Sequence, residues 1–544
     1  MSDIPRRTFL KQSTLATLGV AAIRSGLVAG VEEGARSIGD EPQLLLDDWI
    51  IERQAGLHKT LHQPKKQGLI KEADGTDWQR GDVRSVVRDR KGRLHMVYRY
   101  TWWDPTVRDL HPNIGEDRAH WFHQSTGYAT SDDGHRWHKP NLGLIDAPTG
   151  FRKINEFPFE VPLGFSKNNN LACPIESARE VGVGDSAQKR LMVRYAFRDG
   201  THPFAGVTEE GQCYADDWPD VVHDQHWKEK LTPIPGFNGW PRGSLVGYDP
   251  RAAVWMTLGQ DQIPRWISRG GRDIIRCTSS DMKRWSQPEL VLPVADDEPR
   301  QSRDWVEYME MAASWLGGPK TGVWLGQLVV FHSDRSNPEF EMPTIRNVWR
   351  KGFTELRLMT SRDAGATWQR VGGNQVWLPH HGEENGFDRM LYVGCFVPIK
   401  DTLHFYYPAW DGEHLTFKRN GEPYYSNRMR IGRTALATLR RDGFVSLDAG
   451  AETGSCTTRI LRFDGKELTV NATARRGKLR AELQTASGRP LEGFSIADCE
   501  PVRGDGVSLP VRWRGAEAIA AHAGKPIRVR FDLQEASLFA FQFT

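Results

Sequence analysis

The chain has 544 residues, of which 39% are hydrophobic and 26% are charged, so it has the composition of a soluble globular protein too long for one ordinary domain. A formal net charge of +3, without a basic tract, gives no electrostatic basis for binding nucleic acid. Tryptophan is the outlier, with 20 residues, and predicts extensive aromatic packing.

The first residues have the pattern of an export signal. The twin-arginine segment Arg6-Arg7-Thr8-Phe9-Leu10-Lys11 precedes a modestly apolar run over residues 14–23, which is too short to anchor the chain in a bilayer. Residues 1–38 are therefore predicted to be a twin-arginine signal peptide and leader. We expect a periplasmic or secreted protein with no membrane anchor after signal removal. The alternative is an ordinary basic N-terminus.

A short motif then recurs at intervals of about 70 to 80 residues, the sign of a repeating architecture. It combines Ser, Asp and often Gly with a following Trp, and it starts at Ser131, Ser279 and Ser361, with a weaker copy at Thr208. Ser and Asp side chains can bind backbone amides in a tight turn, and Gly permits a positive φ there. The motif resembles the Asp-box of sialidases, which joins two antiparallel strands.

Strand-turn-strand patterns fill the intervals, and no long stretch has helical periodicity. The first hairpin is predicted at 84–89 and 94–99 around the turn at 90–93, and further strands are predicted at 190–195, 253–258, 323–331, 402–407 and 433–439. We expect an all-β fold in which residues 39–447 form a five-bladed β-propeller, with the last of these strands outermost in its blade. The strand at 43–51 could help close the ring and so remove exposed edges.

The pattern changes after residue 447. Residues 448–544 contain short alternating strands at 466–471, 478–483, 527–531 and 538–543, which predict a small C-terminal antiparallel β-sandwich. Cys456 and Cys499 both fall in this module, and an exported protein could join them in a disulfide. Buried free thiols are the alternative.

The order of strands locates the expected ligand-binding face. If every inner strand begins at one face of the disc, the box turns lie at the opposite face and are structural. Binding residues are then expected where the inner strands begin, around the mouth of the central channel. The predicted substrate-binding residues are Arg80, Arg84, Asn169, Asn170, Arg242 and Glu384, with Trp103 stacking on a sugar ring from the loop after the first hairpin.

Carboxylates at the same positions suit glycoside hydrolysis. One carboxylic acid would protonate the leaving oxygen while a carboxylate activates water or attacks the sugar. The predicted catalytic residues are Asp82, Glu310, Asp388 and Glu307, of which only one of the two glutamates is expected to act. Each could instead pair with a neighbouring Arg. No cofactor is expected, and His380-His381 lack the further ligands that a metal site needs.

Several segments together resemble exported bacterial proteins, abundant in planctomycetes, that look like five-bladed propeller glycosidases. The resemblance rests on residues 45–51, 128–140, 167–170, 285–290, 386–388 and 441–447. This group is similar to the β-fructosidase and arabinanase superfamily. That similarity implies an acidic trio on the first, middle and late inner strands, at Asp82, Glu310 and Asp388. The chain departs from those enzymes because it has no Asn-Asp-Pro-Asn-Gly segment.

Three functions follow from this sequence. The leading prediction is a glycoside hydrolase with a carbohydrate substrate. The second is sialidase-like cleavage of acidic sugars, with Tyr308 beside Glu307 or Glu310 as the nucleophile pair and Arg80, Arg84 and Arg242 clamping a carboxylate. The third is a non-catalytic glycan-binding propeller, which needs the same polar mouth without a close pair of acids.

Overall fold

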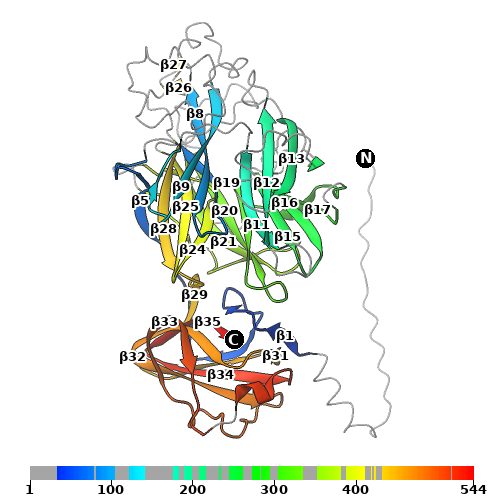
Figure 1. Ribbon diagram of the computed structural model, residues 1–544, viewed down its shortest axis with the longest axis vertical. Coiled ribbons are helices and arrows are strands. Elements are labelled where there is room, and N and C mark those ends of the chain that lie inside the picture. Colours follow the sequence, from blue (N-terminus) through cyan, green and yellow to red (C-terminus); the bar gives the residue numbers. More distant parts are fainter. Residues whose placement is uncertain are drawn as a thin grey trace, which may run out of the picture.

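The computed structural model describes residues 34–78, 81–103, 122–140, 175–182, 189–198, 207–215, 232–233, 244–260, 272–281, 284–294, 304–334, 352–381, 387–410, 418–419, 422–423, 432–515 and 518–544. These residues form an all-β protein, in which a single 3-10 turn, η6 (Ile519–His522), interrupts the strands of the described part. Figure 1 shows two regions along the long axis: a group of sheets, and a second sheet that contains the C-terminus.

The first sheet contains the predicted hairpin. β7 (Asp82–Arg88) and β8 (Leu94–Trp103) pair antiparallel, and β9 (Phe122–Ser131) pairs with β8. The intervening turn is held by Asp89, whose Oδ1 accepts hydrogen bonds from the backbone N–H groups of Lys91 and Arg93 at 2.9 and 2.8 Å. The predicted hairpin is therefore confirmed, together with the reason for its turn.

Four further sheets follow in chain order. The second contains β11 (Ile175–Gly182), β12 (Lys189–Arg198), β13 (Val207–Ala215) and β14 (Thr232–Pro233). The third contains β15 (Ser244–Asp249), β16 (Val254–Gln260), β17 (Ile274–Ser279) and β18 (Glu289–Leu292). The fourth contains β19 (Asp304–Leu316), β20 (Val323–Asp334), β21 (Gly352–Ser361) and β22 (Gln369–Arg370). The fifth contains β23 (Met390–Leu391), β24 (Cys395–Ile399), β25 (Thr402–Trp410), β28 (Gly432–Arg440) and β5 (Lys65–Leu69).

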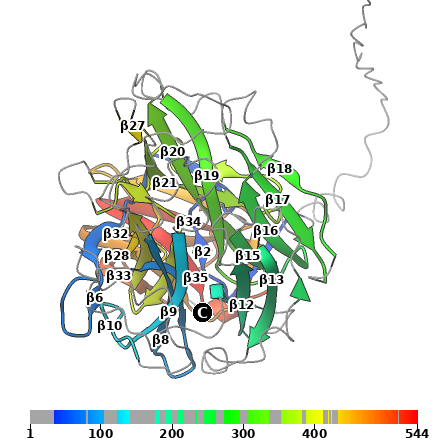
Figure 2. The same ribbon diagram turned by 90° about the horizontal axis from the view of Figure 1, so that it is seen from above.

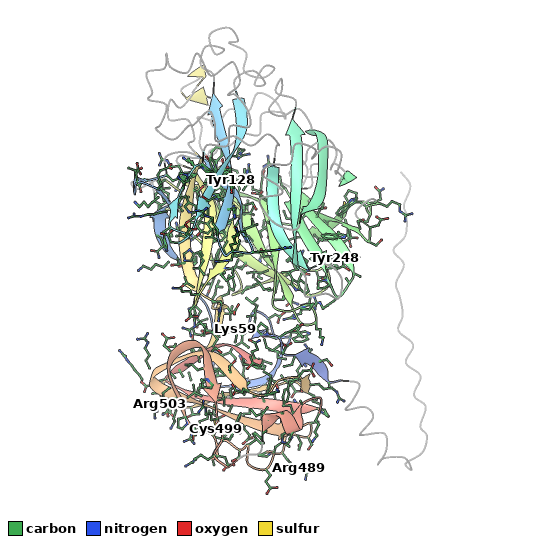
Figure 3. The ribbon with its side chains drawn as sticks, viewed as in Figure 1. Lys59, Tyr128, Tyr248, Arg489, Cys499 and Arg503 are labelled. Atoms are coloured by element: carbon green, nitrogen blue, oxygen red, sulfur yellow. The ribbon has the colours of Figure 1, made fainter. Side chains whose placement is uncertain are left out.

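The sheets are arranged like the blades of a propeller. β7 contacts β11, β11 contacts β15, and β15 contacts β19, while β21 contacts β23 and β25 returns to β7. Figure 2 shows the sheets side by side around a common centre. Two short pairs lie outside these sheets: β6 (Lys71–Glu72) with β10 (Arg136–Trp137), and β26 (Lys418–Arg419) with β27 (Glu422–Pro423).

The edge of the fifth sheet differs from the prediction. The predicted outer strand at 433–439 is β28, which lies between β25 and β5. The residues that cover its outer edge, 65–69, come from before the first sheet. The single strand predicted at 43–51 is absent. This segment contains β2 (Gln43–Leu44) and the first residue of β3 (Ile51–Ala55), and both strands pair with C-terminal strands.

The box motifs form the turns that their chemistry predicts. Ser131 Oγ accepts the N–H of Gly134 at 2.9 Å, and Asp133 Oδ1 accepts the N–H groups of His135 and Arg136 at 2.8 and 2.9 Å. Gly134 has the positive φ of 77° that the turn requires. The copy at 361–368 repeats this pattern, with Gly365 bound to Ser361. The prediction of a weaker box turn at Thr208–Gly211 is wrong, because these residues lie inside β13.

The first box packs against the fifth sheet. Tyr406 donates a hydrogen bond to the carbonyl of Gly134 at 2.7 Å and meets the ring of Trp137 edge-on at 5.5 Å. Its oxygen lies 3.2 Å from Nδ1 of the buried His404. Because Tyr406 gives its proton to Gly134, His404 must donate through Nδ1. Burial, together with His135 and Arg88, lowers the pKa of His404 to about 4.

We expect His404 to make stability depend on pH. The unfolded chain takes up a proton near pH 6.5, whereas the folded chain resists it until about pH 4. The free energy of unfolding should therefore fall as the pH drops through this window, by up to about 1.4 kcal/mol per pH unit. Urea unfolding of the wild type and H404Q at pH 7, 6 and 5 checks this. Equal pH slopes for the two proteins would contradict it.

The C-terminal strands form one continuous sheet with the N-terminal ones. It contains β29 (Val445–Ala449), β30 (Gly454–Thr458), β31 (Leu461–Phe463), β32 (Leu468–Thr485), β33 (Val502–Val511), β34 (Ile527–Gln534) and β35 (Ala536–Phe543), together with β1 (Arg36–Gly39), β2, β3 and β4 (His58–Leu61). β32 spans two of the predicted strands and pairs with β33, β34 and β35. Within residues 36–61, β1, β2, β3 and β4 pair with β31, β35, β30 and β29, respectively.

This sheet surrounds its own apolar core, which includes Leu468, Phe531 and Phe541. Cys456 and Cys499 also lie in this core as free thiols. The structure therefore agrees with the alternative prediction, buried free thiols, and not with a disulfide. Burial raises the pKa of Cys456 to about 12 and also raises that of Cys499. Both thiols are therefore unreactive packing groups.

Contacts at the junction between the sheets account for the Leu-Leu-Asp-Asp-Trp segment at residues 45–49. Asp47 accepts two hydrogen bonds from Arg362 of the third complete box, at 2.6 and 3.2 Å. The Trp49 ring lies between the guanidinium groups of Arg362 and Arg36, at 4.4 and 4.3 Å from its centre. A box turn thus holds the C-terminal sheet against the fourth sheet.

Asp47 and Asp48 offer a matched test of this junction. The Asp47 side chain is 10% exposed and bound by Arg362, whereas that of Asp48 is 92% exposed beside Lys59. We expect D47N to lower the free energy of unfolding by about 1.5–3 kcal/mol, since a charge-assisted hydrogen-bond pair is lost. D48N should change it by less than about 0.5 kcal/mol. Urea unfolding of both variants measures these changes. Equal losses of unfolding free energy in D47N and D48N would contradict the role of Asp47 in the junction.

Candidate functional site

The inner strands begin at the end of the sheets that lies away from the C-terminal sheet, as Figure 1 shows. β7 and β19 start there, and their partners β8 and β20 end there, as does β25 at Trp410. We call this end the mouth. The hairpin turn at 89–93 and the first box lie at the other end, where Leu94 pairs with Ser131. The boxes are therefore remote from the mouth.

Of the predicted residues, the structure brings Asp82, Arg84, Glu307 and Glu310 to the mouth. Trp103 is the last residue of β8 and does not belong to a loop. The predicted residues that lie outside the described part of the chain are Arg80, Asn169, Asn170, Arg242 and Glu384.

The inner strands share a local irregularity near the mouth. The pairing register shifts between Val83 and Ser85 in β7 and between Tyr308 and Glu310 in β19, which leaves one extra residue in each strand. The same shift occurs in β11 and in β15. Counted from the shift, Asp82 of the first sheet and Glu307 of the fourth occupy equivalent positions. Sequence reasoning could not find this equivalence, because the shift leaves no sequence pattern.

The shift also decides which side chains share a face. Glu307 pairs with Phe331 and Glu310 with Val329, two residues apart on β20, so both glutamates lie on one face. Tyr308 pairs with Val330 and is therefore on the opposite face, where it is fully buried. The predicted pairing of Tyr308 with either glutamate as a nucleophile pair is wrong for this reason.

Asp82 is buried and is held by arginines. Its Oδ2 lies 2.9 Å from Nη2 of Arg99, the residue directly opposite on β8, and 3.6 Å from Nε of Arg84. Only 1% of the Asp82 side chain is exposed, against about a fifth of each arginine. Such charge-assisted contacts fix the orientation of the carboxylate.

Glu307 has a similar environment. It is 5% exposed, and its Oε2 lies 3.4 Å from Nε of Arg272, which precedes β17 in the third sheet. The carbonyl of Arg272 accepts the N–H of Tyr308 at 3.0 Å, which ties this segment to the inner strand. Glu310 is partly exposed on the same face. Two sheets thus present acid–arginine pairs at the mouth.

Asp388 has a different setting. Its side chain is fully buried, and it accepts hydrogen bonds from Lys66 at 2.6 Å, from the N–H of His381 at 2.6 Å and from Tyr407 at 3.4 Å. Lys66 and Tyr407 bind Oδ2, whereas the His381 N–H binds Oδ1, which lies 2.8 Å from His381 Nδ1. Lys66 belongs to β5, the outermost strand of the fifth sheet. These contacts tie that outer strand to the segment leading into β23.

The pKa directions reflect this burial. Desolvation lowers the pKa of Lys66, although Asp388 opposes the change. Desolvation and the Asp388 charge both raise the pKa of Tyr407 well above its ordinary value. At neutral pH Tyr407 is therefore a hydrogen-bond donor to Asp388.

One buried polar group near the mouth was missed by the sequence analysis. His332 Nε2 lies 3.1 Å from Glu355 Oε1, which also accepts a 2.6 Å hydrogen bond from Arg357. Burial alone would raise the pKa of Glu355, but His332 and Arg357 outweigh it and lower the pKa. The signal that could have found this group is the pair of charges two residues apart in the otherwise uncharged strand β21.

Gly432 is the point at which two mouth residues meet. A Cβ atom at this position would lie 3.0 Å from Asp82 Oδ1 and 3.1 Å from Cε2 of Trp410. The absence of a side chain therefore lets the carboxylate and the indole ring pack against the same backbone. The backbone of Gly432 also accepts the N–H of Gly81 at 2.8 Å, just before Asp82.

We expect G432A to disturb this packing. Overpacking should lower the free energy of unfolding by about 1–3 kcal/mol, because Asp82 or Trp410 must move. G450A is the matched control, since no atom lies within 4 Å of its added Cβ. It should change stability by less than about 0.5 kcal/mol. Urea unfolding gives both values, and a G432A protein as stable as G450A would contradict the close packing.

Among the residues that the structure describes, no three or more His, Cys, Asp or Glu side chains are grouped as metal ligands. The same part of the chain contains no helix long and apolar enough to cross a membrane.

Comparison with protein-family models finds no match, and comparison with curated proteins finds none. Among solved structures, the chain is similar to a glycoside hydrolase at 14% identity and a TM-score of 0.36, over 70% of this chain and 92% of that one. A β-1,2-mannobiose phosphorylase from Listeria innocua gives 12% and 0.37, over 74% and 97%. A glycosyl hydrolase from Bacteroides ovatus gives 12% and 0.34, over 73% and 96%. At these values no residue role or substrate passes to this chain.

Proposed function

We propose that the first to fifth sheets are the five blades of a closed β-propeller, followed by a C-terminal β-sandwich. The contacts that run from β7 through β11, β15 and β19, and return from β25 to β7, support closure. The pairing of β5 with β28 supports it further, since an early strand completes the last sheet. The separate core around Leu468 and Phe531 supports the sandwich.

The function that this geometry supports best is glycoside hydrolysis at the mouth. The observation that carries the proposal is the equivalence of Asp82 and Glu307. Two buried carboxylates stand at the same position of two different sheets, each beside arginine, at the end where the inner strands begin. Cleavage of a glycosidic bond needs two such carboxyl groups, one on each side of the bond.

In this proposal each group has a defined task. Asp82 and Glu307 share the two carboxyl roles: one gives a proton to the leaving oxygen, and the other activates water or attacks the sugar carbon. Arg99 and Arg272 fix the direction of these carboxylates through the contacts described above. Asp388 is given a structural role, because its contacts tie the outer strand β5 to the segment that leads into β23.

The arginine contacts also favour a second function, glycan binding without cleavage. A carboxylate held by two guanidinium groups, as Asp82 is, makes a good acceptor for sugar hydroxyl groups without any proton transfer. Sialidase-like chemistry is less favoured, because Tyr308 lies on the opposite face from both glutamates.

We also propose that the protein works outside the cytoplasm. The twin-arginine segment at residues 6–11 and the apolar run that follows support export to the periplasm or beyond. A polymeric carbohydrate substrate fits that location, since large glycans are met outside the cell.

The test is turnover of aryl glycosides and oligosaccharides by the mature chain. We expect D82N and E307Q each to lower kcat by about 10²–10⁴-fold, as removal of an acid or base does. E310Q is the matched control on the same face, and it should keep most of the activity. Product release measured by chromatography gives the rates.

The other outcomes separate the alternatives. Activity that is lost in E310Q but kept in E307Q would reverse the choice between the two glutamates. No turnover by the wild type, together with binding on a glycan array that D82N abolishes, would establish the non-catalytic function.

A further inference from the structure

The mouth contains a buried donor that the proposed reaction does not use, the indole N–H of Trp410. Trp410 is the last residue of β25, where it pairs with Gly432 on one side and Met390 on the other. Its side chain is 8% exposed, and Nε1 has no hydrogen-bond partner among the described residues. A buried N–H without an acceptor is destabilising, so an acceptor that the described residues do not supply would stabilise this arrangement.

The neighbours of Trp410 are the residues of the proposed site. A Cβ atom added to Gly432 would lie 3.0 Å from Asp82 Oδ1 and 3.1 Å from Cε2 of the Trp410 indole, so both groups lie beside this glycine. The guanidinium of Arg99, which binds Asp82, lies 5.9 Å from the centre of the Trp410 ring. The ring of Tyr392 meets the indole at 5.9 Å and 60°. A donor, a carboxylate and an aromatic face therefore lie together at one side of the mouth.

An unpaired indole N–H does not by itself mark a site in this protein. Among the described residues, Trp137 and Trp377 also lack a partner for Nε1, and both are fully buried within apolar clusters, the second of which also includes Trp410. Other tryptophans, such as Trp78 and Trp324, do have acceptors, at 2.8 and 2.9 Å. Trp410 differs from the first two because it lies beside the acid–arginine pair at the mouth.

The chemistry of these groups defines the ligand that fits. An indole N–H can only donate, so its partner must be an oxygen acceptor. Asp82 can accept the hydrogen of the same or the adjacent hydroxyl, and Arg99 disfavours a cationic ligand. A sugar hydroxyl meets all three conditions, because it accepts and donates at once and is uncharged.

We propose that Trp410 determines specificity by donating its indole N–H to a hydroxyl of the sugar ring held at Asp82. This inference rests on the proposed function, because it assumes that the mouth binds a carbohydrate. It adds the chemical class of the recognised group, a hydroxyl of an uncharged sugar ring next to the cleaved bond. It also predicts that a sugar lacking that hydroxyl binds less well.

The experiment compares W410F with W377F on p-nitrophenyl glycosides of glucose, galactose, mannose, xylose and arabinose. W410F keeps an aromatic ring and removes the donor, and it should lower kcat/KM by about three- to tenfold, the value of one hydrogen bond. W377F makes the same chemical change in the apolar core and should stay within about twofold of the wild type.

Monodeoxy analogues of the best glycoside identify the hydroxyl. One analogue should be a poor substrate for the wild type and carry no extra penalty in W410F, because the lost hydroxyl and the lost donor are partners. Equal penalties in both proteins for every analogue would overturn the proposal. Should W410F not fold, 3-benzothienylalanine at position 410 gives the same comparison, since it keeps the bicyclic ring and replaces the N–H with sulfur.

The two proposals fail in distinguishable ways. If the wild type hydrolyses or binds a glycoside and W410F behaves like W377F, only the role of Trp410 is overturned. If the wild type neither hydrolyses nor binds any of the glycosides, the carbohydrate function is overturned, and the role of Trp410 with it.

Discussion

The pairing of β5 with β28 is the constraint on which the other features depend. It places residues 65–69 at the outer edge of a sheet whose other strands lie between residues 390 and 440. The buried ion pair of Lys66 with Asp388 holds that strand to the segment entering the fifth sheet. With the first and last sheets held together, the inner strands start at a common end, and residues distant in sequence meet there.

The two ends of the ring use charge differently. At the mouth, Asp82 and Glu307 are buried beside Arg99 and Arg272, whose side chains are 22% and 24% exposed. At the other end, the Arg362 guanidinium binds Asp47 and lies over the Trp49 ring, so it contacts groups of the protein itself. The exposure of these arginines is similar, and what differs is the partner: the mouth pairs join strands of the propeller sheets, whereas Arg362 attaches the C-terminal sheet.

Much of the fold could be predicted because its signals are local. Alternating residues and turn chemistry gave the hairpin around residues 90–93 and the complete boxes. Strands whose partners lie far away in the chain gave no such signal. Lys65-Lys66-Gln67 shows no alternation of polar and apolar residues, and it forms a strand because it pairs with the edge of β28. The choice of Glu307 over Glu310 as the counterpart of Asp82 depends on a one-residue register shift, and the fixing of Asp388 depends on Lys66 and Tyr407.

The interleaving of β1–β4 with the C-terminal strands has a consequence for how the chain is assembled. Gln43 pairs with Phe541 and Ile51 with Thr458. The strands β2 and β3 therefore cannot form these pairs until residues about 400 to 500 positions later have been synthesised. Such contacts give a high contact order and slow closure. Until synthesis ends, the early strands keep unpaired edges that invite association with other chains.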